Sequence, residues 1–253
     1  MNCTAGLCRS SGIHHKEASG RCQGGFSAST RAILYDEHVT ETVFFDVGGT
    51  LILAHPLHWL KPVLDRWGVA ADWSRLAEAA PPAFDFYNAH HLQARSFEEA
   101  LELWRTTDRT ILEGLGVENA AEVADRLVAA WDDPATWPLA PHAHEVLDAL
   151  KARGKKLAVV SNWDGLLPRV LEVVGLADYF DAVVVSALVG AAKPDARIFA
   201  EALARTGADP ETTLHVGDSP EADAEGAAAL GIRPLLVDPT DPARDLRRVL
   251  EVA

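Results

Sequence analysis

The stretch FFDVGGTL, residues 44–51, ends an apolar run on a carboxylate and continues with two glycines and a threonine. Residues 42–47, TVFFDV, are rich in β-branched and aromatic side chains and have the length of a strand. We therefore expect a buried strand that ends at Asp46. An aspartate after a strand is usually a turn former or a helix cap, so its meaning depends on how the other strands end.

Strand and helix patterns alternate from residue 142 to the end of the chain. Strands are predicted at 156–161, 182–186, 212–217 and 233–238, and helices at 142–153, 165–174, 194–206, 221–230 and 243–251. Strands that alternate with helices pair in parallel, and nearly continuous apolar strands indicate a sheet buried on both faces. The sequence therefore predicts an α/β fold with a Rossmann-like, doubly wound parallel sheet.

A helical block separates the first strand from the others. Apolar residues three and four apart predict helices at 57–67, 73–93, 96–115 and 119–131, with no convincing strand between them. Residues 131–141 contain three prolines and have the composition of a linker. We expect a core at 42–55 and 135–253 and an inserted helical cap at 56–134.

Composition narrows the classes of function. Of the 253 residues, 48% are hydrophobic and 24% are charged, which is typical of soluble globular proteins. The net charge of −14 argues against a nucleic-acid partner, because a phosphate backbone binds to a basic surface. No apolar run approaches the roughly 18–20 residues of a membrane span, so no membrane association is expected. An acidic protein that binds phosphorylated molecules would need a cation to offset the repulsion.

Residues 1–38 differ in composition from the rest of the chain. They are rich in Ser, Gly, Ala and Thr and show little apolar periodicity, so we expect a disordered leader. Met1 is the single methionine, and the first strand pattern begins directly after Val39, which suggests a gene start placed too far upstream. All three cysteines, Cys3, Cys8 and Cys22, lie in this leader. A body without cysteine fits a reducing compartment, and we expect the cytoplasm.

Polar side chains stand at four strand ends, in chain order. The strands are followed in turn by Asp46, by Ser161 and Asn162, by GAAKPD with Lys193, and by Gly217-Asp218-Ser219 with Asp223 farther on. In an open parallel sheet, ligands bind at the carboxyl ends of the strands. A carboxylate, a hydroxyl, an amine and further carboxylates are therefore expected around one site. Ser219 and Asp164 are expected only to cap the helices that follow them.

These motifs resemble those of the haloacid dehalogenase superfamily, in its subfamily IA, where a helical C1-type cap is inserted just after the first motif. DVGGTL resembles the first motif, SN the second, KP the third and GDSPEAD the fourth. The resemblance covers essentially everything from residue 42 on.

The resemblance implies a Mg²⁺-dependent phosphohydrolase that acts on a small phosphorylated metabolite through an aspartyl-phosphate intermediate, as a monomer or homodimer. Asp46 would be the nucleophile, and Lys193 would neutralise charge on the transferring group. The implied phosphate-binding residues are Thr50, Ser161, Asn162 and Lys193. The implied Mg²⁺ ligands are Asp46, the backbone carbonyl of Gly48, Asp218 and Asp223.

Gly48 departs from the phosphatase pattern, because family phosphatases usually carry a second aspartate there as the general acid. Three interpretations stay open. The chain could be a phosphatase with weakened acid catalysis, or one with a substitute acid such as His55, His58, His90 or His91. It could be a weakly active or non-catalytic protein that binds phosphate and metal. It could be a metal-independent 2-haloacid dehalogenase, although GDS and Asp223 are retained and no arginine follows the first motif closely.

Several aromatic residues of the helical block are candidates for the cap side of a substrate pocket. They are Trp59, Phe84, Phe86, Tyr87 and Trp104. Aromatic residues at helical spacing more often belong to a core, so they are not counted as site residues.

Overall fold

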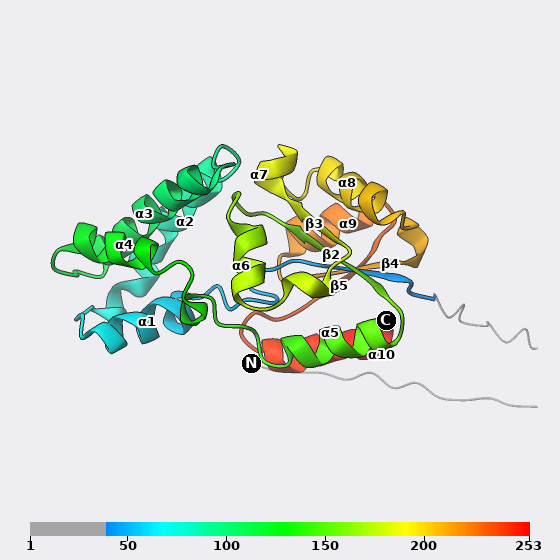
Figure 1. Cartoon of the computed structure of the whole chain (residues 1–253), viewed down its shortest axis with the longest axis horizontal. Helices are drawn as coiled ribbons and strands as arrows, with labels where there is room; N and C mark the ends of the chain where they lie inside the picture. The colour runs from blue at the N-terminus through cyan, green and yellow to red at the C-terminus, as the bar shows by residue number, and fades with distance from the viewer. Residues whose placement is uncertain (1–38) are drawn as a thin grey trace, which may run out of the picture. The chain divides into compact units, whose positions relative to one another are not determined.

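The computed structural model describes residues 39–253, so the predicted leader at 1–38 lies outside the described residues. Five parallel strands form one sheet in the order β3-β2-β1-β4-β5 (Figure 1). The strands are β1 (Thr42–Phe45), β2 (Lys156–Ser161), β3 (Ala182–Val185), β4 (Thr213–Gly217) and β5 (Arg233–Leu236). The predicted α/β fold with a parallel sheet is confirmed.

Strand β1 lies in the middle of the sheet. Its side chains point alternately to the two faces of the sheet, so they pack into two separate hydrophobic clusters. Val43 and Phe45 pack into one hydrophobic cluster, whereas Phe44 between them packs into another. The first cluster includes residues of α5 (Ala143–Ala152), α6 (Leu167–Val173) and α10 (Pro242–Val252). The second includes residues of α8 (Ala196–Thr206) and α9 (Gly226–Ala228). Helices therefore cover both faces, which explains why every β1 side chain is buried.

Four helices lie between β1 and β2 in the chain: α1 (Pro56–Trp67), α2 (Leu76–His90), α3 (Phe97–Gly114) and α4 (Ala120–Ala129). They have a hydrophobic cluster of their own, with Leu60, Leu64, Ile111 and Leu112 fully buried in it. Helix α3 begins at a capping box, in which Ser96 Oγ accepts from Glu99 N and Glu99 accepts from Ser96 N. We refer to α1–α4 as the cap, and to the sheet with its flanking helices as the core.

The chain leaves the core and returns to it through two paired segments. Leu53 N donates to Pro138 O at 2.8 Å, and Ala140 N donates to Leu51 O at 2.8 Å. Ile52 and Leu139 form an antiparallel bridge between the same two segments. The cap is therefore connected to the core by a short two-stranded ribbon.

Two local elements differ from the prediction. The helix expected at 221–230 is instead a π-helical turn, Pro220–Glu225, followed by the short α9. In this turn the backbone N–H groups of Asp223 and Ala224 both donate to Ser219 O, while the Asp223 side chain turns into the core. A short helix, α7 (Ser186–Val189), was not expected, because SALV continues the apolar pattern of β3.

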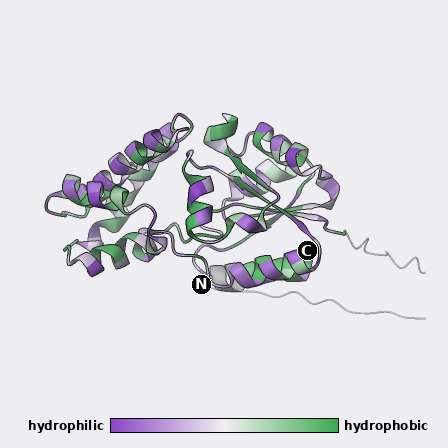
Figure 2. Ribbon diagram, viewed as in Figure 1, coloured by the Kyte–Doolittle hydropathy of each residue, from purple (hydrophilic) through white to green (hydrophobic). Residues whose placement is uncertain are grey.

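The remaining helical turns are short: Trp73–Arg75, Pro134–Thr136, Ala177–Tyr179 and Pro210–Thr212. Figure 2 shows that the cap helices and those that flank the sheet carry both hydrophilic and hydrophobic residues. Within residues 39–253, no helix is long and apolar enough to cross a membrane.

Candidate functional site

A cleft of about 870 Å³ opens at the carboxyl ends of the strands. The predicted site residues that line it are Asp46, Gly48, Ser161, Asn162, Lys193, Asp218 and Asp223. Thr50 is fully buried outside this lining, and its Oγ1 has no hydrogen-bond partner among the described residues. The cleft lining therefore contains all the predicted site residues except Thr50.

Lys193 stands at the centre of the polar contacts. Its Nζ donates to Asp46 Oδ1 at 2.7 Å and to Asp223 Oδ1 at 2.6 Å, and all three side chains are almost fully buried. Burial alone would lower the pKa of Lys193, but the two carboxylates raise it above its ordinary value. The lysine is therefore a permanent positive charge that joins the carboxylate after β1 to the carboxylate of the π-helical turn.

Asp46 is held from a second side by β2. Ser161 Oγ donates to Asp46 Oδ1 at 2.9 Å, on the same oxygen that Lys193 contacts. Burial raises the pKa of Asp46, and the charge of Lys193 opposes this rise. Both donors meet Oδ1, which leaves Oδ2 available to a ligand in the cleft.

Asp223 receives more hydrogen bonds than Asp46, and one donor was missed by the sequence analysis. His215 Nε2 lies 2.8 Å from Asp223 Oδ1, and Ser219 N donates to Oδ2 at 3.0 Å. Burial opposes ionisation, but the bond from His215 and the charge of Lys193 hold the pKa of Asp223 well below its ordinary value. His215 is fully buried on β4, and burial lowers the pKa of this imidazole. The sign of this role in the sequence was a histidine within the apolar strand TTLHVG.

The third carboxylate makes this end of the cleft strongly acidic. Asp46, Asp218 and Asp223 each offer an oxygen within 4.8 Å of the other two. Burial and then the charges of Asp46 and Asp223 raise the pKa of Asp218 to about 7. One ammonium cannot balance three carboxylates. The group therefore has the composition and the spacing of a cation site with hard oxygen ligands.

Two glycines make room for these carboxylates. A Cβ on Gly49, which has φ +82°, would lie 2.3 Å from Asp218 Oδ2. A Cβ on Gly217 would lie 2.2 Å from Asp223 Cγ. Since real Cβ contacts are never this short, the acidic group can form only where the backbone carries no side chain. The glycines of GGTL and HVGDS are therefore part of the site's construction.

Asn162 and Ser219 act mainly on the backbone. Asn162 Oδ1 accepts from Lys193 N at 2.7 Å, and its Nδ2 donates to Lys193 O at 2.9 Å. This two-point bond fixes the main chain from which the lysine reaches Asp46. Ser219 Oγ accepts from Ala222 N at 3.1 Å, so the predicted capping role of Ser219 is confirmed.

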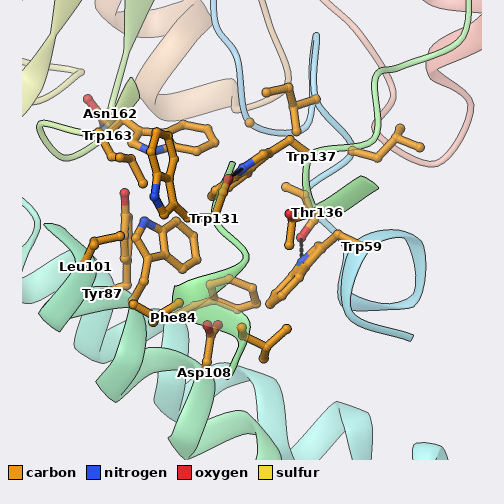
Figure 3. A pocket seen from close by; sticks show the side chains of 18 of the residues that line it. Trp59, Phe84, Tyr87, Leu101, Asp108, Trp131, Thr136, Trp137, Asn162 and Trp163 are labelled. Atoms are coloured by element: carbon orange, nitrogen blue, oxygen red, sulfur yellow. Dashed lines mark hydrogen bonds between the residues drawn. The ribbon is translucent and has the colours of Figure 1, made fainter. Parts of the chain in front are cut away.

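A second cavity, of about 190 Å³, lies beside the cleft, and we call it the aromatic pocket (Figure 3). Five of the chain's seven tryptophans line it, together with Phe84 and Tyr87: Trp59, Trp104, Trp131, Trp137 and Trp163. Gly48, Asn162 and Phe84 belong to the linings of both cavities. A Cβ on Gly48 would meet the Trp163 ring at 3.4 Å, so the missing side chain lies where the two cavities adjoin.

Asp108 on α3 is the carboxylate of the aromatic pocket. Its side chain points toward the rings in Figure 3, and its Oδ1 is buried without a hydrogen-bond partner among the described residues. Burial raises the pKa of Asp108 to about 8. The sequence offered little sign of this residue, because one aspartate in FEEALELWRTTDRTILEG looks like part of an exposed helical face.

Of the five aromatic candidates, four line the pocket, and Phe86 does not. Tyr87 also connects the cap to the core, since its hydroxyl donates to Asp164 Oδ2 at 2.8 Å. Asp164 in turn accepts from Leu166 N at 2.8 Å, within the loop before α6. The helix cap predicted at Asp164 is wrong, because Leu166 is the N-cap of α6 and no side chain among residues 39–253 caps this helix. The side chains of Tyr87 and Asp164 are both buried, and their contact positions α2 over the end of β2.

The four candidate histidines are divided between the cleft and the rest of the cap. His55 and His58 line the cleft, whereas His90 and His91 line neither cavity. His55 also caps α1, because its Nδ1 accepts from Leu57 N at 3.3 Å. Burial and the neighbouring His58 lower the pKa of His55.

The sequence is similar to those of known hydrolases. The sequence profile of haloacid dehalogenase-like hydrolases matches residues 40–231. Haloacid dehalogenase-like hydrolase domain-containing protein 3 of Bos taurus is 37% identical over 215 residues, covering 79% of this chain and 83% of the bovine protein. Phosphoserine phosphatase of Thermus thermophilus is 35% identical over 199 residues, covering 76% of this chain and 75% of that enzyme.

Among solved structures, the fold is similar to that of YfnB from Bacillus subtilis, a protein classed with the HAD hydrolases and crystallised with magnesium. The TM-score is 0.62 with 20% sequence identity, over 85% of this chain and 98% of YfnB. At this identity the likeness concerns the fold.

Asp108→Asn should change how stability depends on pH. Between an ordinary carboxyl pKa of 3.8 and the raised value of about 8, the folded chain keeps a proton that the unfolded chain has lost. The free energy of unfolding therefore falls as the pH rises through this range, by up to about 4 kcal/mol at pH 7. The variant lacks this loss, so its stability relative to the parent should increase from pH 4 to pH 8 in urea unfolding followed by circular dichroism.

The matched control is Asp85→Asn, which removes an exposed carboxylate from the neighbouring helix α2. It controls for the removal of a carboxylate from a cap helix. A difference in the free energy of unfolding between Asp108→Asn and the parent that does not change with pH would contradict the raised pKa.

Proposed function

The chain belongs to the haloacid dehalogenase-like hydrolase family, and from that premise we propose that it is a Mg²⁺-dependent phosphohydrolase acting on a small phosphomonoester. The observation that carries the proposal is the buried ammonium of Lys193 between the carboxylates of Asp46 and Asp223, in one open cleft. The phosphoserine phosphatase among its relatives supports the same reaction class.

The residues of the cleft fit a magnesium ion. Three carboxylates within 4.8 Å of one another supply hard oxygen donors, and Asp218 ionises poorly there unless a cation offsets its neighbours. Asp46, Asp218 and the backbone carbonyl of Gly48 would hold the ion. Asp223 already accepts from Lys193, His215 and Ser219, so its main contribution would be to orient the lysine. When bound, Mg²⁺ would neutralise negative charge on the phosphoryl oxygens and on Asp46.

The proposed reaction begins at Asp46. Its free oxygen attacks phosphorus, a new O–P bond forms, and the bond from phosphorus to the leaving-group oxygen breaks. Water then attacks the aspartyl-phosphate and returns the carboxylate, releasing inorganic phosphate. Lys193 favours the ionised form of Asp46 and offsets charge on the transferring group, and Ser161 supplies a hydroxyl donor at the same place. Asn162 fixes the lysine backbone, and Thr50 stays a prediction because its hydroxyl lies outside the cleft lining.

The leaving-group oxygen must gain a proton, and Gly48 cannot provide one. His55 and His58 are the histidines that line the cleft, so we propose that one of them acts as the acid. If neither does, the enzyme would turn over only esters whose leaving group is stable without a proton. Gly48 is thus the observation that favours the second candidate function, a phosphate- and metal-binding protein with little or no turnover.

The dehalogenase interpretation has less support. Its substrate carboxylate would need a positive partner, and within the described part of the chain Lys193 is the only lysine or arginine that lines the cleft. That lysine is already shared by two carboxylates. The acidic group instead favours a metal-assisted reaction on phosphorus.

We expect hydrolysis of p-nitrophenyl phosphate with Mg²⁺, and loss of this activity in Asp46→Asn or after EDTA treatment. The substitution keeps the shape of the side chain but removes the nucleophilic charge. Asp218→Asn should keep measurable activity while requiring more Mg²⁺. Release of p-nitrophenol measures all of these rates.

An Asp46→Asn variant as active as the parent would eliminate the proposed nucleophile, and a parent without activity at any metal concentration would favour the binding protein.

Gly48→Asp should raise the hydrolysis rate of alkyl phosphates more than that of p-nitrophenyl phosphate. A general acid is worth roughly 10²–10⁴-fold and helps poor leaving groups most. Gly48→Ala is the matched control, because a Cβ there is in ordinary contact with Trp163 and adds no proton donor. Phosphate release from an alkyl and an aryl ester, measured in parallel, gives the comparison. Equal changes in rate for both esters in both variants would mean that a side chain at position 48 acts only through its volume.

The substitute acid can be identified with His55→Asn and His58→Gln. Asparagine is also a good helix cap, so the first substitution preserves the start of α1. The variant that lacks the acid should lose about 10²-fold on an alkyl phosphate and little on p-nitrophenyl phosphate. His90→Gln, outside both cavities, should match the parent. Uniform losses on both substrates in His55→Asn and His58→Gln would assign these histidines to binding instead.

A further inference from the structure

The aromatic pocket has a composition that neither the reaction nor the packing of the cap requires. Five tryptophans, a phenylalanine and a tyrosine surround about 190 Å³ of open space. The rings of Trp104, Trp137 and Trp163 contact one another, with centroids 5.6–6.3 Å apart, and form one wall. Trp59, Phe84 and Asp108 line the same pocket (Figure 3). Such rings present negative electrostatic potential on their faces, which attracts cations.

Asp108 adds the second, independent observation. Its side chain belongs to the pocket lining, it is 4% exposed, and its Oδ1 has no partner among the described residues. A buried carboxyl group without a partner costs stability and is rarely kept without a role. Among residues 39–253, no positively charged side chain lines the pocket. The pocket therefore supplies a potential negative charge and lacks the positive charge to match it.

The pocket is also connected to the reaction centre. Gly48 and Asn162, which line the cleft beside Asp46 and Lys193, line the pocket as well. The two cavities therefore adjoin at Gly48, and an aspartate side chain there would occupy space between them. A phosphoryl group at Asp46 leaves the rest of a substrate free to extend toward the aromatic rings.

We propose that the aromatic pocket binds an organic cation, an ammonium or quaternary ammonium group carried by the leaving group of the substrate, with Asp108 as its counter-charge. The proposal rests on the phosphohydrolase function proposed above and specifies its substrate class. Cation and carboxylate neutralise each other in the pocket, while the rings solvate the apolar surface of the cation. A neutral apolar group would fill the same space but would leave Asp108 without a partner.

Binding can be tested without turnover, because the pocket tryptophans report on it. Tetramethylammonium chloride is titrated into the full chain at constant ionic strength, and 3,3-dimethylbutan-1-ol serves as the neutral probe of similar shape. We expect saturable quenching of tryptophan fluorescence by the cation, with affinity about tenfold lower in Asp108→Asn. Asp85→Asn, an exposed carboxylate on α2, should bind like the parent. No saturable change, or equal affinity for the neutral probe, would overturn the proposal.

A second variant keeps the test independent of Asp108. Trp59→Leu replaces one ring by an apolar side chain and should weaken tetramethylammonium binding more than binding of the neutral alcohol. Equal weakening of binding for both probes would mean that the ring provides only a hydrophobic contact, and this result would contradict a cation site.

Turnover then separates the substrate class from the reaction class. Choline phosphate is compared with its uncharged isostere, 3,3-dimethylbutyl phosphate, and p-nitrophenyl phosphate is the reference. We expect kcat/KM at least about tenfold higher for choline phosphate, and loss of this preference in Asp108→Asn. Activity on p-nitrophenyl phosphate without that preference would overturn the cation proposal alone. Inactivity on all three esters, together with saturable cation binding, would instead contradict the proposed phosphohydrolase.

Discussion

The contact on which the rest of the site depends is the buried ammonium of Lys193 between Asp46 and Asp223. An isolated charge in a protein interior is very unfavourable, and these three groups are tolerated together because each is hydrogen-bonded to another of opposite sign. The partners come from the end of β1, the loop before α8 and the turn after β4, so the ion pairs connect three distant parts of the chain. Removing either carboxylate would leave the lysine partly uncompensated.

The cleft around this contact and the aromatic pocket beside it differ in the groups that they gather. The cleft gathers carboxylates and the lysine, whereas the adjoining pocket gathers aromatic rings and one carboxyl group, whose pKa is raised by burial to about 8. Gly48 stands at the boundary between the two. A side chain at this position would contact the ring of Trp163, so the identity of residue 48 bears on both cavities.

The sequence predicted the sheet and most of the cleft, because both follow from local patterns. Strand ends in a parallel sheet converge, so Asp46, Ser161, Lys193 and Asp218 could be assigned to one place from their positions alone. Other features depend on packing between distant segments. His215 and Asp108 look like ordinary residues of a strand and a helix, and Trp131, Trp137 and Trp163 meet the cap only in three dimensions. Thr50 matches the first motif, but it does not line the cleft.

The paired ribbon at Leu53 and Pro138 has a consequence for how this architecture can vary. Since the two strands of the ribbon are joined by a 2.8 Å hydrogen bond, the core is geometrically closed at that point whatever is carried beyond it. The pairing of β1 with β2 and β4 lies on the core side of this connection. A change within the cap that leaves the ribbon intact therefore need not disturb the register of the sheet, although residues of both parts line the two cavities.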